Sequence, residues 1–421
     1  MIAKVPPMGW NSWDCYGGSV NEETVRKNAE YMAARLKQYG WEYIVVDIQW
    51  YQPTASSHAY EPFAELNMDA YGRLLPAENR FPSAKGGRGF GPLADYIHSL
   101  GLKFGIHIMR GLPRMAAHRA LPIAGSGFTC KDAADPNSVC AWNPDMYGLR
   151  CDGWSANPEA AKAYYGSIFR LYAAWGVDYV KCDDIAREYP HCKKEIECIS
   201  EACRACGREI VLSLSPGPAP LEQAEHLKKY ANLWRITDDF WDDWKLLKPM
   251  FERAEKWCVH AGPGHWPDAD MLPVGALRQC EDPGNWTRFT EAEQRTMMTL
   301  WCMMRSPLMI GSELNKLDDF TLRLLTNAPL LCIGRESFGG HPLYTRDDAA
   351  AWAAMPKDGQ GLYCALFNLS DEARALTLTA EEVGMASFTG AEMWTGVPVD
   401  RADAVTVTLA PHDAAVWLMR E

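Results

Sequence analysis

The chain has 421 residues, 48% of them hydrophobic, and a formal net charge of -12. This length predicts two domains, or one large barrel with an appendage, because single compact cores are usually smaller. The negative charge argues against a nucleic-acid or anionic-membrane partner. No secretory signal and no membrane-spanning segment can be recognised, so we expect a cytoplasmic protein.

Helical and strand patterns alternate over the first three quarters of the chain. Strands are expected at 8–10, 43–48, 103–108, 179–181, 210–214, 233–235 and 308–310, and the stretch around Asp268 and Asp270 is expected to be a loop. Helical segments between them end at Gly40, Gly101, Gly176 and Gly207, which is typical of helix stops. About eight alternations predict a (β/α)8 TIM barrel over residues 1–330.

After about residue 334 the pattern changes to short strands separated by Gly, Pro, Asn and Asp turns. These strands are expected at 350–355, 362–367, 375–378, 387–393, 405–409 and 414–418. Their spacing predicts a C-terminal antiparallel β-sandwich domain over residues 331–421. A sandwich beside a barrel leaves enough surface for a homodimer.

The fourteen cysteines lack the spacing of a zinc site or of a disulfide framework. Cys203 and Cys206 form a C-x-x-C pair, but no second pair follows at a suitable distance. We therefore expect reduced thiols, as is usual in the cytosol. The ten histidines are scattered, and the sequence predicts neither a metal nor another cofactor.

Charged side chains follow two of the predicted barrel strands. Lys181 and Asp183 are two residues apart and therefore lie on one strand face. Arg235, Asp238 and Asp239 come after a later strand, and the C-terminal ends of barrel strands share one mouth. Many of the seventeen tryptophans lie near strand ends, where aromatic faces suit sugar rings. Two carboxylates in such a pocket are typical of glycoside hydrolysis.

Three other functions fit part of this pattern. Lys181 at a strand end suits a Schiff-base aldolase. That chemistry needs a lysine with a low pKa, however, and Asp183 and Asp184 would raise the pKa of Lys181. A metal-dependent hydrolase could use the aspartates with His107 or His265, but no H-E-x-x-H motif occurs. A non-catalytic sugar-binding barrel would lack one carboxylate of the pair.

Six motifs in order resemble those of glycoside hydrolase family 27, the α-galactosidase or melibiase family, along essentially the whole chain. They are Met8-Gly-Trp-Asn-Ser-Trp13, Val46-Asp47 with Trp50, Val180-Lys-Cys-Asp-Asp184, Trp234-Arg-Ile-Thr-Asp-Asp239, Gly262-Pro-Gly-His-Trp-Pro-Asp-Ala-Asp-Met271 and Ser306-Pro-Leu-Met-Ile-Gly311. The resemblance implies a retaining exo-glycosidase for terminal α-D-galactopyranosyl-type linkages of an oligosaccharide or glycoside. It implies Asp183 as nucleophile and Asp239 as general acid and base.

The same resemblance implies the residues that bind the substrate. Lys181 would stabilise the Asp183 anion and hold hydroxyls, and Arg235 and Asp47 would each bind a hydroxyl. Trp13 would form a wall of the pocket. Asp270 lies in the matching aspartate-methionine motif.

Three departures from the family pattern concern specificity. Ile48 follows Asp47 where α-galactosidases have a second aspartate, so a C6 hydroxyl would lose its partner at a cost of roughly 1 to 3 kcal/mol. The sequence therefore resembles β-L-arabinopyranosidase-like members, whose sugar has the galactose configuration without C6. Ser215 matches the serine of α-N-acetylgalactosaminidases, and His107 replaces a usual Tyr. An ordinary α-galactosidase and an α-N-acetylgalactosaminidase thus remain alternatives.

Overall fold

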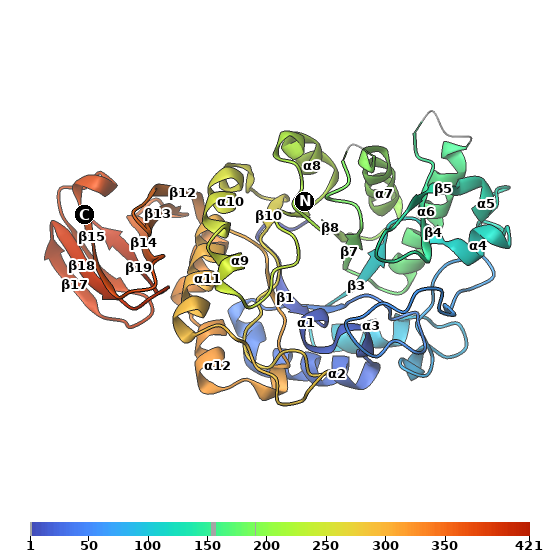
Figure 1. Cartoon of the computed structure of the whole chain (residues 1–421), viewed down its shortest axis with the longest axis horizontal. Coiled ribbons are helices and arrows are strands. Elements are labelled where there is room, and N and C mark those ends of the chain that lie inside the picture. The colour runs from blue at the N-terminus through green and yellow to red at the C-terminus, as the bar shows by residue number, and fades with distance from the viewer. Residues whose placement is uncertain (1, 153–156, 190) are drawn as a thin grey trace.

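A computed structural model describes residues 2–152, 157–189 and 191–421, and the predicted barrel is present. Eight parallel strands lie in the order β10-β9-β8-β7-β3-β2-β1-β11 (Figure 1). Beyond β10, Leu272 closes the circle: its N–H donates to Met309 O at 2.7 Å, and Gly311 N–H donates to Leu272 O at 3.0 Å. The strands are β1 (Met8–Asn11), β2 (Tyr43–Val46), β3 (Lys103–Met109), β7 (Tyr179–Asp183), β8 (Val211–Leu214), β9 (Leu233–Arg235), β10 (Trp266–Asp268) and β11 (Leu308–Ile310).

Helices surround the barrel, and their ends carry the expected signals. Thr290 caps the helix before β11 with a capping box to Glu293, and Gly176 turns the chain into β7 with a φ of 79°. The helices are α1 (Trp13–Tyr16), α2 (Glu22–Tyr31), α3 (Gly91–Ser99), α4 (Arg114–His118), α5 (Cys130–Ala133), α6 (Pro158–Ala174), α7 (Lys193–Ala205), α8 (Ala224–Tyr230), α9 (Trp244–Leu247), α10 (Met250–Trp257), α11 (Glu291–Met304), α12 (Asp319–Leu325) and α13 (Ala328–Glu336).

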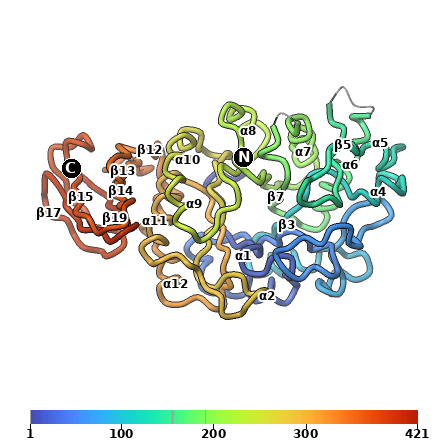
Figure 2. Tube along the Cα trace, in the orientation of Figure 1, coloured from blue at the N-terminus to red at the C-terminus, as the bar shows by residue number. Residues whose placement is uncertain are grey.

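Apolar side chains fill the lower interior of the barrel. Tyr43, Val45, Tyr179, Val211, Leu233 and Trp266 form one buried cluster. The N-terminal segment packs against this end, where Ala3 O accepts hydrogen bonds from Gly264 N and Trp266 Nε1 (N-terminal end in Figure 2). The alternating residues that point outward, such as Ile44 and Val46, join the larger core under the helices. The barrel is therefore a packed core, and substrates can enter only at its other end.

The C-terminal region forms the predicted β-sandwich. A six-stranded antiparallel sheet, β12-β13-β14-β19-β16-β17, faces the two-stranded sheet β15-β18 across a small apolar core. The strands are β12 (Ser337–Arg346), β13 (Ala349–Pro356), β14 (Leu362–Asn368), β15 (Arg374–Thr379), β16 (Phe388–Glu392), β17 (Pro398–Ala402), β18 (Ala404–Leu409) and β19 (Ala414–Arg420). The domain division at residue 330 falls within α13 and stays a prediction.

Helix α11 joins the sandwich to the barrel. Arg295 forms a bidentate ion pair with Asp413, and the ring of Trp244 stacks on His412 with centroids 3.8 Å apart. Trp394 Nε1 also donates to Thr299 on α11. The sandwich lies at one end of the molecule and the β4–β6 insertion at the other, with the barrel between them (Figure 1).

Several strands were not predicted. β10 forms where a loop was expected, and β12 and β17 extend the sandwich. A small sheet of β4 (Leu112–Pro113), β5 (Ala134–Val139) and β6 (Met146–Leu149) also inserts after β3. β5 and β17 are polar and largely exposed, and β12 contains Gly339, Gly340 and Pro342, so tertiary pairing overrides their weak strand propensity.

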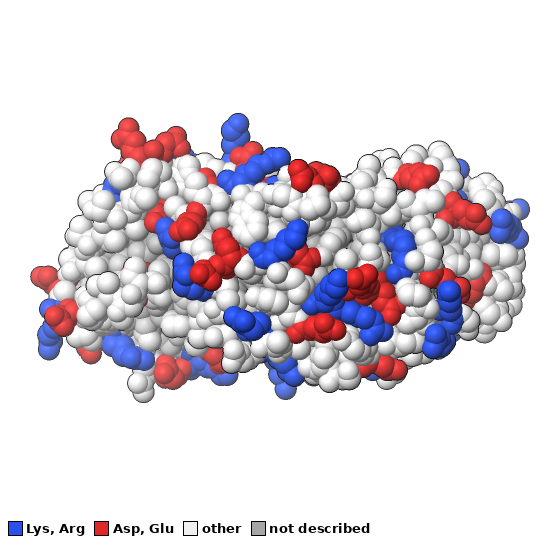
Figure 3. All heavy atoms as spheres, turned by 90° about the horizontal axis from the view of Figure 1, so that it is seen from below, with Lys and Arg blue, Asp and Glu red and all other residues white. Residues whose placement is uncertain are grey.

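All fourteen cysteines lie among the described residues and are free thiols. No helix within the described ranges is long and apolar enough to cross a membrane. On the face shown in Figure 3, acidic and basic side chains are interspersed.

Arg80 ties together the loops next to the cavity mouth, and its removal should destabilise the fold. Its Nη1 donates to the carbonyls of Gln49 and Gln52, and its Nη2 donates to those of Gly18 and Val20. Because Arg80→Ala leaves these carbonyls without their donor, we expect the free energy of unfolding to fall by about 3 kcal/mol. Urea unfolding followed by fluorescence measures the loss.

Arg80→Lys keeps the charge but cannot reproduce the planar fork of donors, so an intermediate loss is expected. Arg88→Ala is the matched control, because Arg88 is exposed and donates to a carbonyl on its own loop. Equal stability of Arg80→Ala and Arg88→Ala would contradict the anchoring role.

Candidate active site

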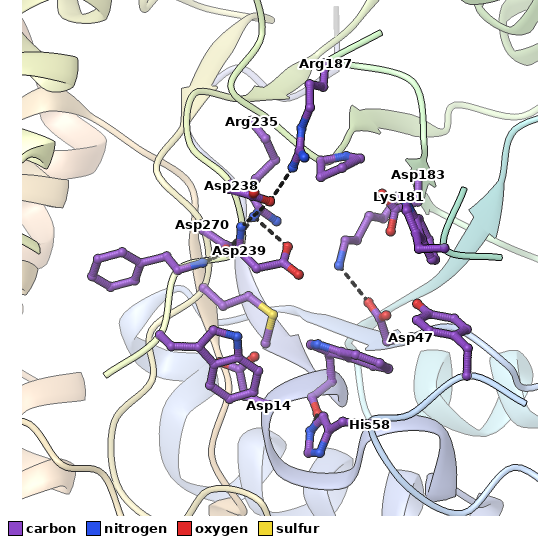
Figure 4. A pocket seen from close by; sticks show the side chains of 17 residues that line it. Asp14, Asp47, His58, Lys181, Asp183, Arg187, Arg235, Asp238, Asp239 and Asp270 are labelled. Atoms are coloured by element: carbon purple, nitrogen blue, oxygen red, sulfur yellow. Dashed lines mark hydrogen bonds and ion pairs between the residues drawn. The ribbon is translucent and has the colours of Figure 1, made fainter. Parts of the chain in front are cut away.

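A cavity of about 320 Å³ lies at the C-terminal ends of the barrel strands (Figure 4). It is rich in carboxylates and in aromatic rings. The lining residues are Trp13, Asp14, Asp47, His58, Tyr60, Trp142, Lys181, Asp183, Arg187, Pro216, Arg235, Asp238, Asp239, Phe240, Trp241, Asp270 and Met271.

The two-residue period of the strands places these groups in layers. On β7, Tyr179 belongs to the lower interior, and Lys181 and Asp183 follow on the same face at the cavity. On β2, Tyr43 and Val45 lie in the lower interior and Asp47 follows them at the cavity. Each charged group therefore stands on a rigid strand end above a filled layer of apolar side chains.

Asp183 is held as an anion. His107 Nε2 donates to its Oδ2 at 2.8 Å, and Asp184 N–H donates to its Oδ1 at 2.9 Å. Burial by itself would raise the pKa of Asp183, but the His107 hydrogen bond and the Lys181 charge lower it well below the usual value. His107 is fully buried and its Nδ1 has no hydrogen-bond partner among the described residues, whereas its Nε2 carries the proton that is donated to Asp183.

Asp47 and Lys181 form a buried pair on adjacent sides of the cavity. Lys181 Nζ donates to Asp47 Oδ2 at 3.0 Å, and Asn11 Nδ2 donates to the same oxygen at 2.8 Å. Burial opposes the charge of Lys181, yet Asp47 and Asp183 raise its pKa above the usual value. A lysine held protonated in this way is unsuited to Schiff-base chemistry.

Arg235 connects two further carboxylates. Its Nη2 lies 2.7 Å from Asp270 Oδ2 and 3.1 Å from Asp239 Oδ1. Asp239 is 60% exposed at the mouth and points into the cavity from the side opposite Asp183 (Figure 4). Asp270 is buried, and burial together with Asp239 and Asp268 outweighs Arg235 and raises its pKa to about 6.

Asp14 is a buried carboxyl that the sequence did not single out. Its Oδ2 has no hydrogen-bond partner within the described part of the chain and lies so close to Gly311 that a Cβ there would be 2.3 Å away. Burial, and then the negative charge of Asp270, raise its pKa well above the usual value. Burial thus favours the protonated form of this carboxyl in the cavity wall.

Three of the predicted site residues do not line the cavity. Ile48 is 1% exposed and belongs to the apolar core, and His107 reaches the cavity only through Asp183. Ser215 is buried and its Oγ has no partner among the residues that the structure describes, whereas the next residue, Pro216, lines the cavity. The other predicted residues, Trp13, Asp47, Lys181, Asp183, Arg235, Asp239 and Asp270, meet around it.

Loops supply the lining residues that sequence reasoning missed. His58 and Tyr60 come from the long segment between β2 and β3, and Trp142 comes from the insertion between β5 and β6. Arg187 forms an ion pair with Asp238 at the mouth. The chain carries no periodic signal for these positions, because loop side chains acquire their neighbours only in the folded state. Among the described residues, no group of three or more His, Cys, Asp or Glu side chains has the geometry of a metal site.

Comparison with known proteins identifies the fold and the family. Residues 141–336 match the family described as alpha-galactosidase A. The α-galactosidase of Coffea arabica is 30% identical over 389 residues, which cover 92% of this chain and 85% of that protein. The crystal structure of a β-L-arabinopyranosidase of glycoside hydrolase family 27 from Geobacillus stearothermophilus is 50% identical, has a TM-score of 0.95, and covers 100% of this chain and 97% of that one.

The chain belongs to the α-galactosidase family, glycoside hydrolase family 27. It is therefore a glycoside hydrolase, and the resemblance carried by the six sequence motifs is confirmed. A variant of the Geobacillus enzyme in complex with arabinose has the same TM-score of 0.95. Because an α-galactosidase and a β-L-arabinopyranosidase are both relatives of this chain, membership of the family does not determine the sugar, which depends on the residues of the cavity.

The raised pKa of Asp14 predicts a pH-dependent effect of Asp14→Asn. A carboxyl whose pKa is higher in the folded than in the unfolded state binds its proton more tightly when folded, so stability falls as pH rises from the unfolded pKa to the folded one. Asn does not titrate. The stability of Asp14→Asn relative to wild type should therefore increase between pH 4 and pH 8, as measured by urea unfolding.

Asp95→Asn on α3 is the control, because Asp95 is exposed on the helix surface. The wild-type and Asp95→Asn curves should run parallel over the same pH range. A difference between Asp14→Asn and wild type that does not change with pH would show that Asp14 carries no shifted titration.

Proposed function

We propose that this enzyme hydrolyses terminal β-L-arabinopyranosides, and α-D-galactopyranosides less well, with retention of configuration. Asp183 is the nucleophile and Asp239 is the general acid and base. Trp13, Asp47, Lys181, Arg235 and Asp270 bind the sugar directly. His107 positions Asp183, and Ile48 and Ser215 shape the cavity from behind its wall.

The observation that carries the mechanism is the contrast between the two carboxyls. Asp183 accepts hydrogen bonds from His107 and Asp184 and has a lowered pKa, which suits a group that must attack as an anion. Asp239 points into the cavity from the opposite side and is open to solvent, where a leaving group and a water molecule can reach it.

The proposed reaction has two displacements. Asp183 forms a bond to the anomeric carbon while Asp239 gives its proton to the departing glycosidic oxygen. Asp239, now ionised, takes a proton from water, which attacks the same carbon and releases Asp183. Arg235 bridges Asp239 and Asp270 and stabilises the ionised form of Asp239 between the two steps.

The sugar preference rests on the residue next to Asp47. Ile48 offers no hydrogen bond where many α-galactosidases have a carboxylate, and a C6 hydroxyl would lose its partner there. The 50% identity to the Geobacillus β-L-arabinopyranosidase supports the same preference. Ser215 would favour a sugar with a 2-acetamido group, but this residue does not line the cavity, so its support for that sugar is weak.

We also infer a cytoplasmic location, which the fourteen free thiols support. A homodimer stays a prediction, as does the assignment of residues 331–421 to a separate domain.

Four 4-nitrophenyl glycosides test the proposed function by kcat/KM: β-L-arabinopyranoside, α-D-galactopyranoside, N-acetyl-α-D-galactosaminide and α-D-glucopyranoside. We expect the arabinopyranoside to lead by about tenfold or more, which corresponds to roughly 1.4 kcal/mol. NMR of the first product should show the anomer of the substrate. A galactoside or galactosaminide in first place would contradict the sugar assignment, and an inverted first product would contradict the mechanism.

Asp183→Ala should abolish hydrolysis, because the covalent intermediate cannot form. Added azide should restore part of the turnover and give a glycosyl azide of inverted configuration, since it attacks the anomeric carbon directly in a single displacement. Kinetics with and without azide, and NMR of the azide product, measure both effects.

Asp239→Ala is the matched comparison. In this variant the rate of the first step should fall only slightly with a 4-nitrophenyl leaving group, which departs without a proton. Azide should give a glycosyl azide of retained configuration, because it replaces water in the second displacement. Near-normal hydrolysis by Asp183→Ala, or azide products of the same configuration from both variants, would overturn the assignment.

A further inference from the structure

The cavity has one charged side and one aromatic side. Arg235, Asp239 and Asp270 lie on the charged side, joined by the ion pairs of Arg235, and Lys181, which also lines the cavity, is paired with Asp47. The aromatic side, here called the aromatic wall, consists of Trp13, Tyr60 and Trp142. The rings of Trp13 and Tyr60 stack with centroids 6.1 Å apart at 29°, and those of Tyr60 and Trp142 are 4.8 Å apart.

The depth of the carboxylates orients the sugar in this cavity. Asp239 is 60% exposed, whereas the Asp47 side chain is 2% exposed. An exo-acting enzyme holds the anomeric carbon near the mouth, between Asp183 and Asp239, so the opposite ring carbon, C4, meets Asp47. Two ring edges then remain, the C2–C3 edge with two hydroxyls and the C5–O5 edge.

The two edges of the sugar match the two sides of the cavity. Hydroxyls at C2 and C3 require ionic and hydrogen-bonding partners, which the charged side supplies. The C5–O5 edge of a pentopyranose carries no hydroxyl and suits an aromatic surface. A hexose differs by one carbon on C5, and that carbon would point at the aromatic wall.

Tyr60 is the middle ring of the aromatic wall, since it contacts both Trp13 and Trp142. It lines the cavity together with Asp183 and Asp47, the carboxylates next to C1 and C4 of the sugar in this orientation. Burial raises the pKa of the Tyr60 phenol well above the usual value, and the next causes are the charges of Asp183 and then Asp47. Ile48, in contrast, is buried in the core and does not line the cavity.

The segment around Tyr60 is fastened on both sides. His58 Nε2 bonds Trp13 O at 2.8 Å, and its Nδ1 lies 3.0 Å from Glu281 Oε1. On the other side, Gln52 Nε2 donates to Glu61 Oε2 at 3.0 Å. These anchors fix the Tyr60 ring before substrate arrives, so the ring can exclude a group by its volume.

We propose that Tyr60 is a specificity-determining residue whose ring, packed between Trp13 and Trp142, covers the C5–O5 edge of the sugar and excludes a substituent on C5. This inference rests on the proposed function and adds a steric determinant to the missing hydrogen bond at Ile48.

Three 4-nitrophenyl glycosides that differ only at C5 separate the two determinants: β-L-arabinopyranoside with hydrogen, α-D-fucopyranoside with methyl and α-D-galactopyranoside with hydroxymethyl. In Tyr60→Ala, the kcat/KM of the fucoside and of the galactoside, each relative to the arabinopyranoside, should rise about tenfold or more. Tyr60→Phe keeps the ring, so both ratios should stay within about threefold of wild type. Tyr60→Leu is a second, less disruptive truncation.

Ile48→Asp serves as the contrasting variant. It restores a partner for a C6 hydroxyl, so it should raise the galactoside ratio and leave the fucoside ratio unchanged. Tyr71→Ala is the matched control, because Tyr71 is exposed in the same segment between β2 and β3 and does not line the cavity. Thermal unfolding confirms that each variant is folded.

Equal losses on all three sugars in folded Tyr60→Ala and Tyr60→Leu would overturn the inference. The inference would also be overturned if the loss of kcat/KM depended on the leaving group and not on the substituent on C5. Replacing 4-nitrophenyl with methyl tests this dependence. The wild-type ratios test the sugar preference by themselves, whereas the change from wild type to variant tests Tyr60. The two claims can therefore fail separately.

Discussion

Lys181 is the buried cation on which the charges of the cavity depend. Taking carboxylates out of water costs several kcal/mol each unless a partner compensates them. Lys181 bonds Asp47 directly and lowers the pKa of Asp183 through its charge, so one cation serves two anions on different strands. The two-residue period of β7 sets this arrangement, because it puts Lys181 and Asp183 on one face above Tyr179.

A single cation cannot compensate every carboxyl in the cavity, and the remaining ones behave differently. Arg235 is paired with Asp270 and Asp239, yet burial still raises the pKa of Asp270 to about 6. Asp14 has an oxygen without a hydrogen-bond partner among the described residues, and burial raises its pKa well above the usual value. The cavity thus contains a carboxyl with a lowered pKa next to Lys181, Asp183, and carboxyls with raised pKa values elsewhere, and a lowered pKa suits nucleophilic attack.

The parts of the site that the strand pattern alone could predict lie on strands or directly after them, whereas Trp13 and Asp270 were predicted from the motifs that contain them. Lys181, Asp183 and Arg235 could be placed because each follows a buried strand and the ends of parallel strands share one mouth. Tyr60 and Trp142 could not, since each comes from a long loop without periodicity. The same reasoning explains the fold: the seven barrel strands with strong apolar runs were expected, but the short Trp266–Asp268 strand forms only through pairing with β9.

We therefore expect the sugar specificity of this cavity to depend both on residues at strand ends and on residues in the loops. The strand ends and the segments directly after them hold the proposed nucleophile Asp183, the proposed acid Asp239 and the polar side chains that can bind hydroxyls. The loops decide what else fits, because Tyr60 and Trp142 contact each other and enclose one edge of the cavity. A change at Ile48 alone alters whether a hydrogen-bonding group is available for a C6 hydroxyl. A change in the loop alters the space that is available to the sugar. Since strand positions are constrained by the packed barrel beneath them and loop positions are not, new sugar preferences should arise more readily in the loops.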